Sequence, residues 1–461
     1  MKQSLRNLLG HRPKRAGRRD FLKNATAMLG AAAAGTFWAD KTLDAAVQNT
    51  QTNSGPSQLK ITDLRVLTVA RAPFTCPIIR IDTNQGISGY GEVRDGASKT
   101  YALLLKSRIL GQNPCNVEQI FRRLRQFGGT GRMAGGVVSI EEALWDLAGK
   151  AYNVPIYQML GGKYRDTIRL YCDTTQSNDP VEFGKRIKLR MDEGFTWMKM
   201  DIGSSMLRNT PGTISRPLGG TDRAGGREHS FSGVELTLKG CEMMADYIMK
   251  VREVIGWEVP ISTDHFGAMG VNSIIKLGKA FEKCNLAWME DTVPWYRTDL
   301  LKQIHDALDV PILTGEDIYL MEPFEVLCKA QAVDIIQPDL STAGGILETK
   351  RIGDMAQKYG VPMALHMAGT PVCAFANAHC AAATESFLVM ENHSVDVPWW
   401  DSLVDGVEKP IINKGFIKVP DGPGLGFQLN EAAVKQHLQE PGYFEPTPQW
   451  DRERSQDNLY S

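Results

Sequence analysis

The sequence predicts an α/β protein in which a barrel of parallel strands follows a smaller α+β domain. Three strand-like segments each end on a carboxylate, at Asp264, Glu290 and Glu316, and both intervals between these acids are 26 residues long. That interval is about the length of one strand plus one helix, and strand and helix patterns keep alternating through 169–409. Because the carboxyl ends of barrel strands meet at one face, we expect the three acids to lie together.

The first 45 residues have the pattern of an export signal. A basic stretch leads to Arg18-Arg19, and the short Ala-rich apolar segment 25–34 follows. This order resembles a twin-arginine signal, so we expect a periplasmic protein with the signal at 1–45 and cleavage between about residues 34 and 46. A basic amphipathic helix is the alternative interpretation. Residues 46–58 are polar and are expected to form a linker.

Composition limits the class of partner. The chain has 461 residues, 43% of them hydrophobic, and a formal net charge of −1, which is typical of a soluble globular protein. No basic excess indicates nucleic-acid binding. No apolar run reaches the roughly 18 residues that a membrane span needs. We therefore expect a small-molecule partner, no nucleic acid and no stable membrane insertion once the signal is removed.

The region 59–168 has the pattern of an α+β domain. Alternating β-branched residues and the turn sequence 84–86 predict an antiparallel meander, and apolar residues at helical spacing predict helices after it. The terminal segment, about 410–440, has strand and turn patterns and is expected to return to this domain. The predicted strands are 61–70, 76–82 and 86–93, and the predicted helices include 117–127 and 139–152.

Three carboxylates that converge on one face predict a metal site. They cannot all stay ionised close together unless a cation neutralises them. Oxygen ligands without Cys or His favour a hard ion such as Mg²⁺. We therefore predict that Asp264, Glu290 and Glu316 bind Mg²⁺. The alternative is that each acid caps a helix, since acids are favoured in the first turn.

A histidine and an aspartate continue the same spacing. Asp339 and His366 each follow a strand-like segment, and they are 27 residues apart. On neighbouring strand ends, Asp339 would accept a hydrogen bond from one imidazole nitrogen and fix the tautomer of His366. His366 is therefore our candidate general base. The alternative is a core histidine with satisfied hydrogen bonds.

Several motifs in order resemble a known family. The helix 141–151 leads into Pro155–Gly162, Gly89-Tyr90-Gly91-Glu92 precedes it, and Pro423-Gly424-Leu425-Gly426 lies near the end. Over residues 59–430 the chain resembles the mandelate racemase/muconate lactonizing enzyme group of the enolase superfamily, and in its motifs the galactonate-dehydratase-like branch. The resemblance implies a modified (β/α)₇β TIM barrel with a capping domain over the active site, one Mg²⁺ per subunit and a homo-oligomer.

The resemblance also implies roles for single residues. Many relatives carry Lys-x-Lys with the second lysine as base, and here Lys199 is followed by Asp201 in that second position. Lys199 is then expected to bond the substrate carboxylate or to act as an acid. Glu391, 25 residues after His366, is expected to contact the substrate carboxylate in its protonated form.

A second histidine is a candidate acid. Galactonate-dehydratase-like relatives place a general-acid histidine two residues after the first metal ligand, but here Phe266 holds that place and His265 precedes it. Strand alternation would turn His265 away from Asp264 and the site. His265 and Asp201 are therefore secondary candidates for catalysis.

A long segment, 204–232, follows Lys199 and Asp201. It is rich in Gly, Arg and Ser, and long loops at the catalytic end of a barrel are often functional. Its basic residues would suit a second carboxylate or a large sugar acid, and a surface insertion is the alternative. These residues are Arg208, Arg216, Arg223, Arg227 and His229.

These features predict an enzyme that removes the α-proton of a sugar-acid carboxylate and forms an enediolate. With one evident base, β-elimination of water is the simplest outcome, which makes the protein a carbon–oxygen lyase of the acid-sugar dehydratase type. A cycloisomerase or epimerase shares the first step and is the enzymatic alternative. A periplasmic sugar-acid binding protein on an inactive barrel is the alternative from another class.

Overall fold

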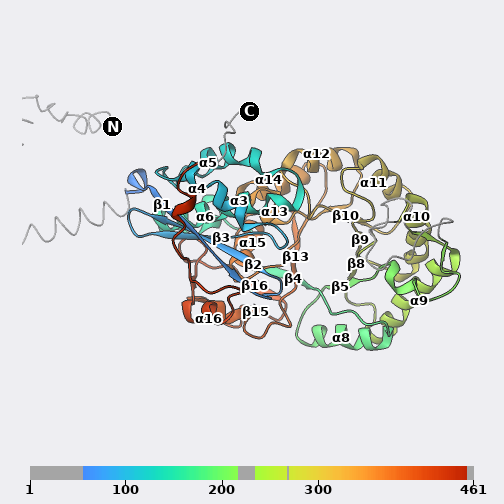
Figure 1. The fold of residues 1–461 in the computed structure, drawn as a ribbon. Coiled ribbons are helices and arrows are strands. Elements are labelled where there is room, and N and C mark those ends of the chain that lie inside the picture. Colours follow the sequence, from blue (N-terminus) through green and yellow to red (C-terminus); the bar gives the residue numbers. More distant parts are fainter. Residues whose placement is uncertain (1–54, 216–233, 267–268, 454–461) are drawn as a thin grey trace, which may run out of the picture. The chain divides into compact units, whose positions relative to one another are not determined.

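The structure is a computed structural model that describes residues 55–215, 234–266 and 269–453. Its eight parallel strands form a closed barrel, because the first strand, β4, pairs with the last, β13 (Figure 1). Helical crossovers join successive strands, so the predicted (β/α)₇β fold is confirmed. The strands are β4 (Thr167–Cys172), β5 (Met198–Asp201), β8 (Ile261–Asp264), β9 (Trp288–Glu290), β10 (Ile312–Thr314), β11 (Ile335–Ile336), β12 (Met363–Leu365) and β13 (Phe387–Asn392).

The helices of the crossovers lie outside the strands (Figure 1). Buried apolar residues on their inner faces and on the strands form one continuous core between the two layers. The helices are α8 (Pro180–Asp192), α9 (Leu238–Ile255), α10 (Val271–Phe281), α11 (Thr298–His305), α12 (Met321–Ala330), α13 (Leu340–Ala343), α14 (Gly345–Gln357) and α15 (Pro371–Ala383).

A buried aromatic and aliphatic layer fills the inside of the barrel. It includes Trp197, Trp288 and Val389. Side chains two residues farther along a strand point to the same face, one layer closer to its carboxyl end. This alternation places Lys199, Glu290 and Glu391 directly above the apolar layer. Inside the barrel, a charged layer therefore lies directly on the apolar layer, toward the carboxyl ends of the strands.

We call residues 61–159 the cap. Its antiparallel sheet, β1 (Ile61–Val69), β2 (Cys76–Thr83) and β3 (Ser88–Glu92), packs against the long helix α6 (Gly135–Tyr152). A Cβ on Gly91 would lie 2.0 Å from the carbonyl oxygen of Ser139, so strand and helix approach more closely than any side chain allows. The other cap helices are α3 (Lys99–Leu104), α4 (Lys106–Ile109), α5 (Val117–Leu124) and α7 (Ile156–Met159).

Buried glutamates join the cap to the barrel helices. Glu92 accepts hydrogen bonds from the backbone N–H groups of Thr370 (2.9 Å) and Cys373 (3.2 Å), at the start of α15. Glu141 accepts from those of Ile346 (2.8 Å) and Leu347 (3.1 Å), at the start of α14. Carboxylates suit helix N-termini because these carry unpaired N–H groups and a positive dipole end. The Gly-Tyr-Gly-Glu and Glu-Glu-Ala motifs therefore dock the cap.

The terminal segment returns to the cap only in part. Strands β15 (Ile412–Asn413) and β16 (Phe416–Lys418) extend the barrel sheet, because β16 pairs antiparallel with β4. Farther on, Gly424 bonds the backbone at Val154, and Leu438 bridges to Val69 of β1. The remaining elements are β14 (Val404–Asp405), β17 (Gln428–Leu429) and α16 (Glu431–Gln436).

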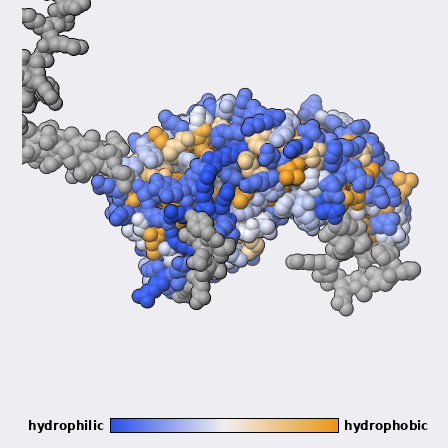
Figure 2. Space-filling view, turned by 90° about the horizontal axis from the view of Figure 1, so that it is seen from above, coloured by the Kyte–Doolittle hydropathy of each residue, from blue (hydrophilic) through white to orange (hydrophobic). Residues whose placement is uncertain are grey.

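The visible face in Figure 2 is mostly hydrophilic, with apolar residues in scattered small groups. Within the described ranges, no helix has the length and apolar character that a membrane crossing requires.

Candidate active site at the carboxyl end of the barrel

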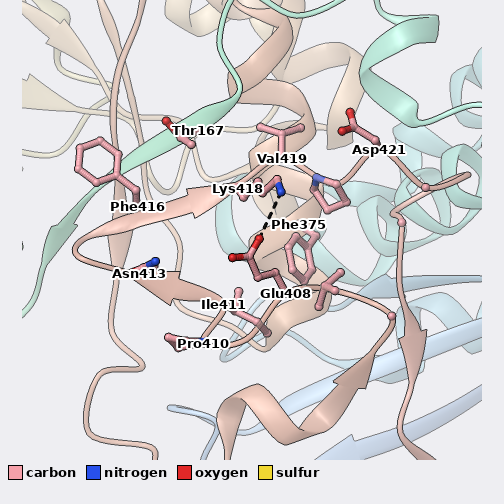
Figure 3. Close-up of a pocket in the computed structure, with 15 residues that line it drawn as sticks. Thr167, Phe375, Glu408, Pro410, Ile411, Asn413, Phe416, Lys418, Val419 and Asp421 are labelled. Atoms are coloured by element: carbon pink, nitrogen blue, oxygen red, sulfur yellow. Dashed lines mark hydrogen bonds and ion pairs between the residues drawn. The ribbon is translucent and has the colours of Figure 1, made fainter.

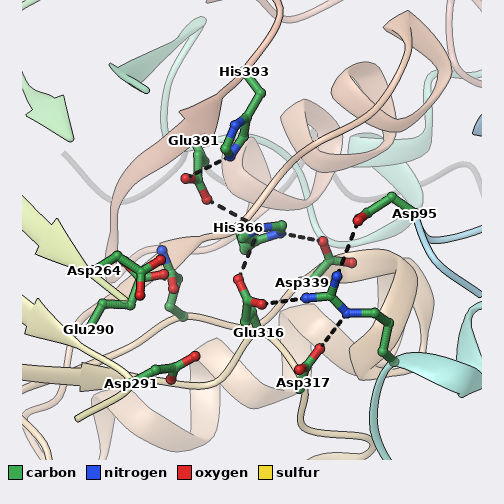
Figure 4. Close-up of polar contacts among 12 residues, drawn as sticks. Asp95, Asp264, Glu290, Asp291, Glu316, Asp317, Asp339, His366, Glu391 and His393 are labelled. Atoms are coloured by element: carbon green, nitrogen blue, oxygen red, sulfur yellow. Dashed lines mark hydrogen bonds and ion pairs between the residues drawn. The ribbon is translucent and has the colours of Figure 1, made fainter. Parts of the chain in front are cut away.

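The predicted site residues lie around the carboxyl end of the barrel (Figure 4). Strand pairing sets Asp201 beside Asp264, and the same register continued to β9 sets Asp264 beside Glu290. Their side chains meet because they leave neighbouring strands at the same level. The remaining predicted residues follow on the next strand ends, at Glu316, Asp339, His366 and Glu391.

Lys199 lies at the centre of three carboxylates. Its Nζ is 2.9 Å from Asp264 Oδ2, 3.4 Å from Glu290 Oε1 and 2.9 Å from Glu391 Oε1. Burial alone would lower the pKa of Lys199, but the three negative charges raise it well above its ordinary value. Lys199 is therefore a cation at neutral pH and not a free base.

The predicted metal ligands lie on adjoining strand ends, but their oxygens do not form one cluster. In the described chain, the donor atoms gathered within 4.8 Å of one another belong to His366, Glu391 and His393, and to Asp201, Asp264 and His265. Within the predicted triad, Asp264 and Glu290 share Lys199, whereas Glu316 Oε2 lies 3.0 Å from His366 Nε2.

The charges at this end of the barrel nevertheless fit a hard cation. Burial and the charge of Asp264 raise the pKa of Glu290 well above its usual range. Burial and the charge of Glu316 do the same to the neighbouring Asp291. Both carboxylates are thus buried beside a second carboxylate, and an added divalent ion with oxygen ligands would stabilise their ionised forms.

His366 and Asp339 form the predicted pair. His366 Nδ1 lies 2.7 Å from Asp339 Oδ2, and both side chains are almost fully buried. Burial would raise the pKa of Asp339, but the charge of Arg94 and the hydrogen bond with His366 lower it. Nε2 of the same ring faces Glu316 (3.0 Å) and Glu391 (3.5 Å). A proton on Nδ1, donated to an ionised Asp339, would leave Nε2 as the reactive nitrogen.

Two cap arginines that sequence reasoning missed complete this side of the site. Arg94 bonds Asp339 and lies 3.5 Å from Glu316 Oε1, while Arg132 bonds the same oxygen at 2.6 Å. Both arginines also bond Asp95. The only sequence signal for Arg94 was its place directly after the Gly-Tyr-Gly-Glu strand, which does not reveal what it meets in the barrel.

Glu391 contacts a histidine, which in turn contacts a second carboxylate. His393 Nε2 lies 2.9 Å from Glu391 Oε1, and its Nδ1 lies 3.1 Å from Asp173 Oδ2. Burial would raise the pKa of Glu391, but above all the charge of Lys199, together with the contact with His393, holds it well below its usual range. These contacts favour an ionised Glu391, in contrast to the protonated form that the family resemblance implies.

His265 does not turn away from the site as strand alternation predicts. Its φ of +74° ends the extended strand, and its Nε2 lies 3.2 Å from Asp201 Oδ2. The hydrogen bond to Asp201 raises the pKa of His265 to about 9. The ring is 61% exposed, at the mouth of the barrel beside Asp264. His265 and Asp201 thus form a protonated histidine–carboxylate pair.

Some predictions fall outside the described residues. They include the export signal (1–45) and the basic residues Arg216, Arg223, Arg227 and His229 of the long segment. Of that segment the structure describes the beginning, a 3₁₀ turn at Ser204–Leu207, and the short pairing of β6 (Ile214–Ser215) with β7 (Glu235–Leu236), and Arg208 is exposed.

A pocket of about 390 Å³ lies away from these residues (Figure 3). It is lined by Thr167, at the amino-terminal start of β4, and by the ion pair between Lys418 and Glu408 (3.2 Å). Because barrel chemistry needs the opposite end of the strands, this pocket is not the candidate active site.

Comparisons with known proteins agree with this architecture. Family models match for the mandelate racemase/muconate lactonizing enzyme N-terminal domain over residues 43–161 and for the enolase C-terminal domain-like family over 182–433. A D-xylonate dehydratase from Haloferax volcanii is 30% identical over 400 residues, 85% of this chain and 92% of that protein. A D-galactonate dehydratase family member from Salmonella virchow is 27% identical over 430 residues, 88% of this chain and 99% of that protein.

The solved structure of a mandelate racemase/muconate lactonizing enzyme-like protein from Rubrobacter xylanophilus is 28% identical and has a TM-score of 0.74. The match covers 84% of this chain and 99% of that one. The two curated relatives are named as dehydratases or members of a dehydratase family, and dehydratases are carbon–oxygen lyases, which agrees with the predicted enzyme class. The chain belongs to the mandelate racemase/muconate lactonizing enzyme group of the enolase superfamily.

Proposed function

We propose that the protein is a Mg²⁺-dependent acid-sugar dehydratase. It removes the α-proton of a sugar-acid carboxylate and then eliminates the β-hydroxyl group as water, which yields a 2-keto-3-deoxy acid. The observation that carries the proposal is the buried His366–Asp339 pair, in which His366 Nε2 faces the carboxylates of neighbouring strand ends. The names of the relatives support the same reaction class.

His366 is the base in this reaction. Because Nδ1–H is held by Asp339, the lone pair of Nε2 takes the α-proton, and the electrons of the C–H bond pass into the substrate carboxylate. Asp264, Glu290 and Glu316 would hold Mg²⁺, whose charge would stabilise the enediolate. Lys199 adds a second fixed cation on the same side of the site.

Glu391 and the His265–Asp201 pair act on the hydroxyl groups of the substrate. Glu391 Oε2 is buried, makes no hydrogen bond within the described residues and lies 3.5 Å from His366 Nε2, so it is available to a substrate hydroxyl group beside the base. The protonated His265 gives its proton to the departing hydroxide, which leaves as water. The α-proton and the proton of the leaving group thus pass through different histidines.

Lys199 favours elimination over epimerisation. An epimerase needs a second base on the opposite face of the substrate, but Lys199 is held protonated by Asp264, Glu290 and Glu391. Asp201, in the position of the usual second lysine, is bonded to His265. Cycloisomerisation shares the first step and is distinguished by its ring product. A binding protein would not need the base and its aspartate partner.

Proton exchange at the α-carbon tests the proposal. The purified protein would be incubated in D₂O with Mg²⁺ and a panel of aldonic and aldaric acids, and the products followed by NMR. A 2-keto-3-deoxy product is the expected result. Deuterium in recovered substrate without product would indicate an epimerase, and a rearranged ring a cycloisomerase. No exchange with any acid, with or without Mg²⁺, would contradict the enediolate mechanism and favour a binding protein.

The variant His366→Asn supplies the control for this experiment. It keeps the shape of the site but removes the base, so exchange and dehydration should both fall by about 10²- to 10⁴-fold. Calorimetry should find that Mg²⁺-dependent binding of the same acid is retained. If His366→Asn turned over the acid like the wild type, the base would have to be another residue.

We also propose that the protein is exported by the twin-arginine route to the periplasm and works there as a homo-oligomer. The order of basic residues, Arg18-Arg19 and an apolar segment supports export. Replacing both arginines by lysine should keep the protein in the cytoplasm, as followed by cell fractionation. Light scattering on the purified protein would give the number of subunits.

A further inference from the structure

Arg94 reaches the candidate site from the cap. It lies two residues after β3, and its side chain is 2% exposed. Nη1 bonds Asp339 Oδ2 and lies 3.1 Å from Asp95 Oδ1, and Nη2 lies 3.5 Å from Glu316 Oε1. His366 Nδ1 lies 2.7 Å from the same Asp339 oxygen. It also lies 2.5 Å from Arg94 Nη1, so the cap arginine and the candidate base are in direct contact. A cap arginine and the candidate base therefore share one carboxylate oxygen.

Asp339 needs a cation that is present before the reaction begins. It is buried as deeply as Arg94, and a buried carboxylate without a compensating charge is strongly disfavoured. His366 cannot supply that charge, because a base must be neutral before it accepts a proton. Arg94 is permanently charged and its planar fork fits a carboxylate. The charge of Asp339 is therefore balanced from the cap and not from the barrel.

We infer that Arg94 is a positioning residue that acts on the base through Asp339: it holds this carboxylate in place beside Nδ1, so that His366 keeps its proton on Nδ1 and presents Nε2 to the substrate. The inference rests on the proposed role of His366 as the base. Because Arg94 belongs to the cap and the other two residues to the barrel, the base is complete only where cap and barrel are docked. Cap docking thereby assembles the base as well as covering the substrate.

Arg132 provides the comparison that isolates this role. It also enters from the cap, and it bonds Asp95, Glu316 and Asp317 at 3.2, 2.6 and 3.0 Å. Among its contacts in the structure there is none with Asp339 or His366. The charge of Arg132 also helps to lower the pKa of Asp339, but the hydrogen bonds of Asp339 do not depend on it. A change at Arg132 should therefore disturb Glu316 more than the tautomer of His366.

The tautomer can be measured without any substrate. In Mg²⁺-loaded protein labelled with ¹⁵N-histidine, the nitrogen shifts of His366, assigned with His366→Asn, report which nitrogen carries the proton. We expect Nδ1–H in the wild type and in Arg132→Met, and a mixture of tautomers in Arg94→Met and in Asp339→Asn. A wild-type Nδ1–H signal in Arg94→Met would overturn the inference.

Kinetics supply a second measurement through a double-mutant cycle. Partners that orient metal-binding histidines typically contribute 10- to 100-fold, and we expect Arg94→Met to slow α-proton exchange by about the same factor at saturating substrate, with KM little changed. If Arg94 acts through Asp339, the double variant Arg94→Met/Asp339→Asn should be no slower than Asp339→Asn alone, within about threefold. Arg132→Met combined with Asp339→Asn should instead show losses that multiply.

Multiplying losses for Arg94 and Asp339 would overturn the inference, because Arg94 would then act elsewhere. If Arg94→Met does not fold, Arg94→Lys replaces it: the ammonium group keeps the charge but loses the fork, so mixed tautomers and roughly tenfold slower exchange are expected. Wild-type behaviour of Arg94→Lys in both measurements would also overturn it. A wild type that exchanges no acid would refute the proposed function, while the tautomer measurement would still decide the role of Arg94.

Discussion

Lys199 and His366 owe their different chemistry to their neighbours. Lys199 contacts three carboxylates and is held protonated, so it acts by charge. His366 contacts one carboxylate through Nδ1, which leaves its other nitrogen for proton transfer.

Lys199→Met should make the fold depend on Mg²⁺. Without the ammonium group, Asp264 and Glu290 lose their shared cation, and breaking a buried pair costs about 3–5 kcal/mol. Added Mg²⁺ should recover much of this loss by binding the same carboxylates. Urea unfolding of wild type and variant in EDTA and in Mg²⁺ measures the difference, with the exposed Lys279→Met as control. An equal loss in both conditions would argue against a cation site there.

Asp201→Asn should shift the pH dependence of dehydration. The hydrogen bond from Asp201 raises the pKa of His265 to about 9, so the histidine is protonated below that pH and loses its proton above it. Wild-type dehydration should therefore fall above about pH 9. In Asp201→Asn the fall should move toward the ordinary histidine value of about 6.5. The rate of α-proton exchange, which depends on His366, serves as the control. An unshifted fall would exclude His265 as the acid.

At the scale of elements, the close packing of β3 on α6 decides where the cap residues lie. Gly91 allows this approach, and Arg94 follows it by three residues. Gly91→Ala would place a Cβ 2.0 Å from the carbonyl oxygen of Ser139, so the strand or helix must move. We expect a loss of about 1–3 kcal/mol or more in the free energy of unfolding, as for other overpacked sites.

The matched control is Gly86→Asn in the turn before β3. There φ is +75°, which Asn tolerates, and a Cβ would meet nothing within 4 Å. Chemical denaturation of both variants should give a much smaller loss for Gly86→Asn. A stability of Gly91→Ala equal to that of the control would mean that the strand moves away from α6 at no cost.

Local spacing predicted the barrel and the strand-end residues, because one strand plus one helix takes a nearly constant length of chain. The same reasoning could not find Arg94 or Arg132. Their partners lie on another domain, and no local pattern in the cap states which barrel acid each will meet. His265 was misjudged for a different reason: alternation holds only while the strand stays extended, and the strand ends at the positive φ of this residue.

At the scale of the whole described chain, buried carboxylates hold cap and barrel together. Glu92 and Glu141 bond the first N–H groups of α15 and α14, and both are fully enclosed. Burial is the largest influence on each, and it raises the pKa of Glu92 to about 7 and that of Glu141 to about 8, although the N–H groups act in the opposite direction. The docking contacts therefore make the stability of the fold depend on pH.

Glu141→Gln should flatten the dependence of stability on pH. In the unfolded chain Glu141 titrates near 4.5, whereas in the fold it keeps its proton to about pH 8. Between these values the unfolded state binds fewer protons than the fold, so the free energy of unfolding falls as pH rises and stays low above pH 8. Glutamine mimics the protonated carboxyl group and does not titrate. The variant should therefore lose less stability from pH 5 to 9, by roughly 2 kcal/mol or more at about 1.4 kcal/mol per pKa unit.

Denaturant unfolding at each pH measures this difference, with exposed Glu253→Gln as the control that should keep the wild-type slope. A residual fall near pH 7 should remain in Glu141→Gln, because Glu92 still titrates there. Parallel profiles for the wild type and Glu141→Gln would mean that Glu141 is already ionised in the fold, held by the N–H groups of α14. In that case the helix terminus, and not burial, would set the charge at the junction between cap and barrel.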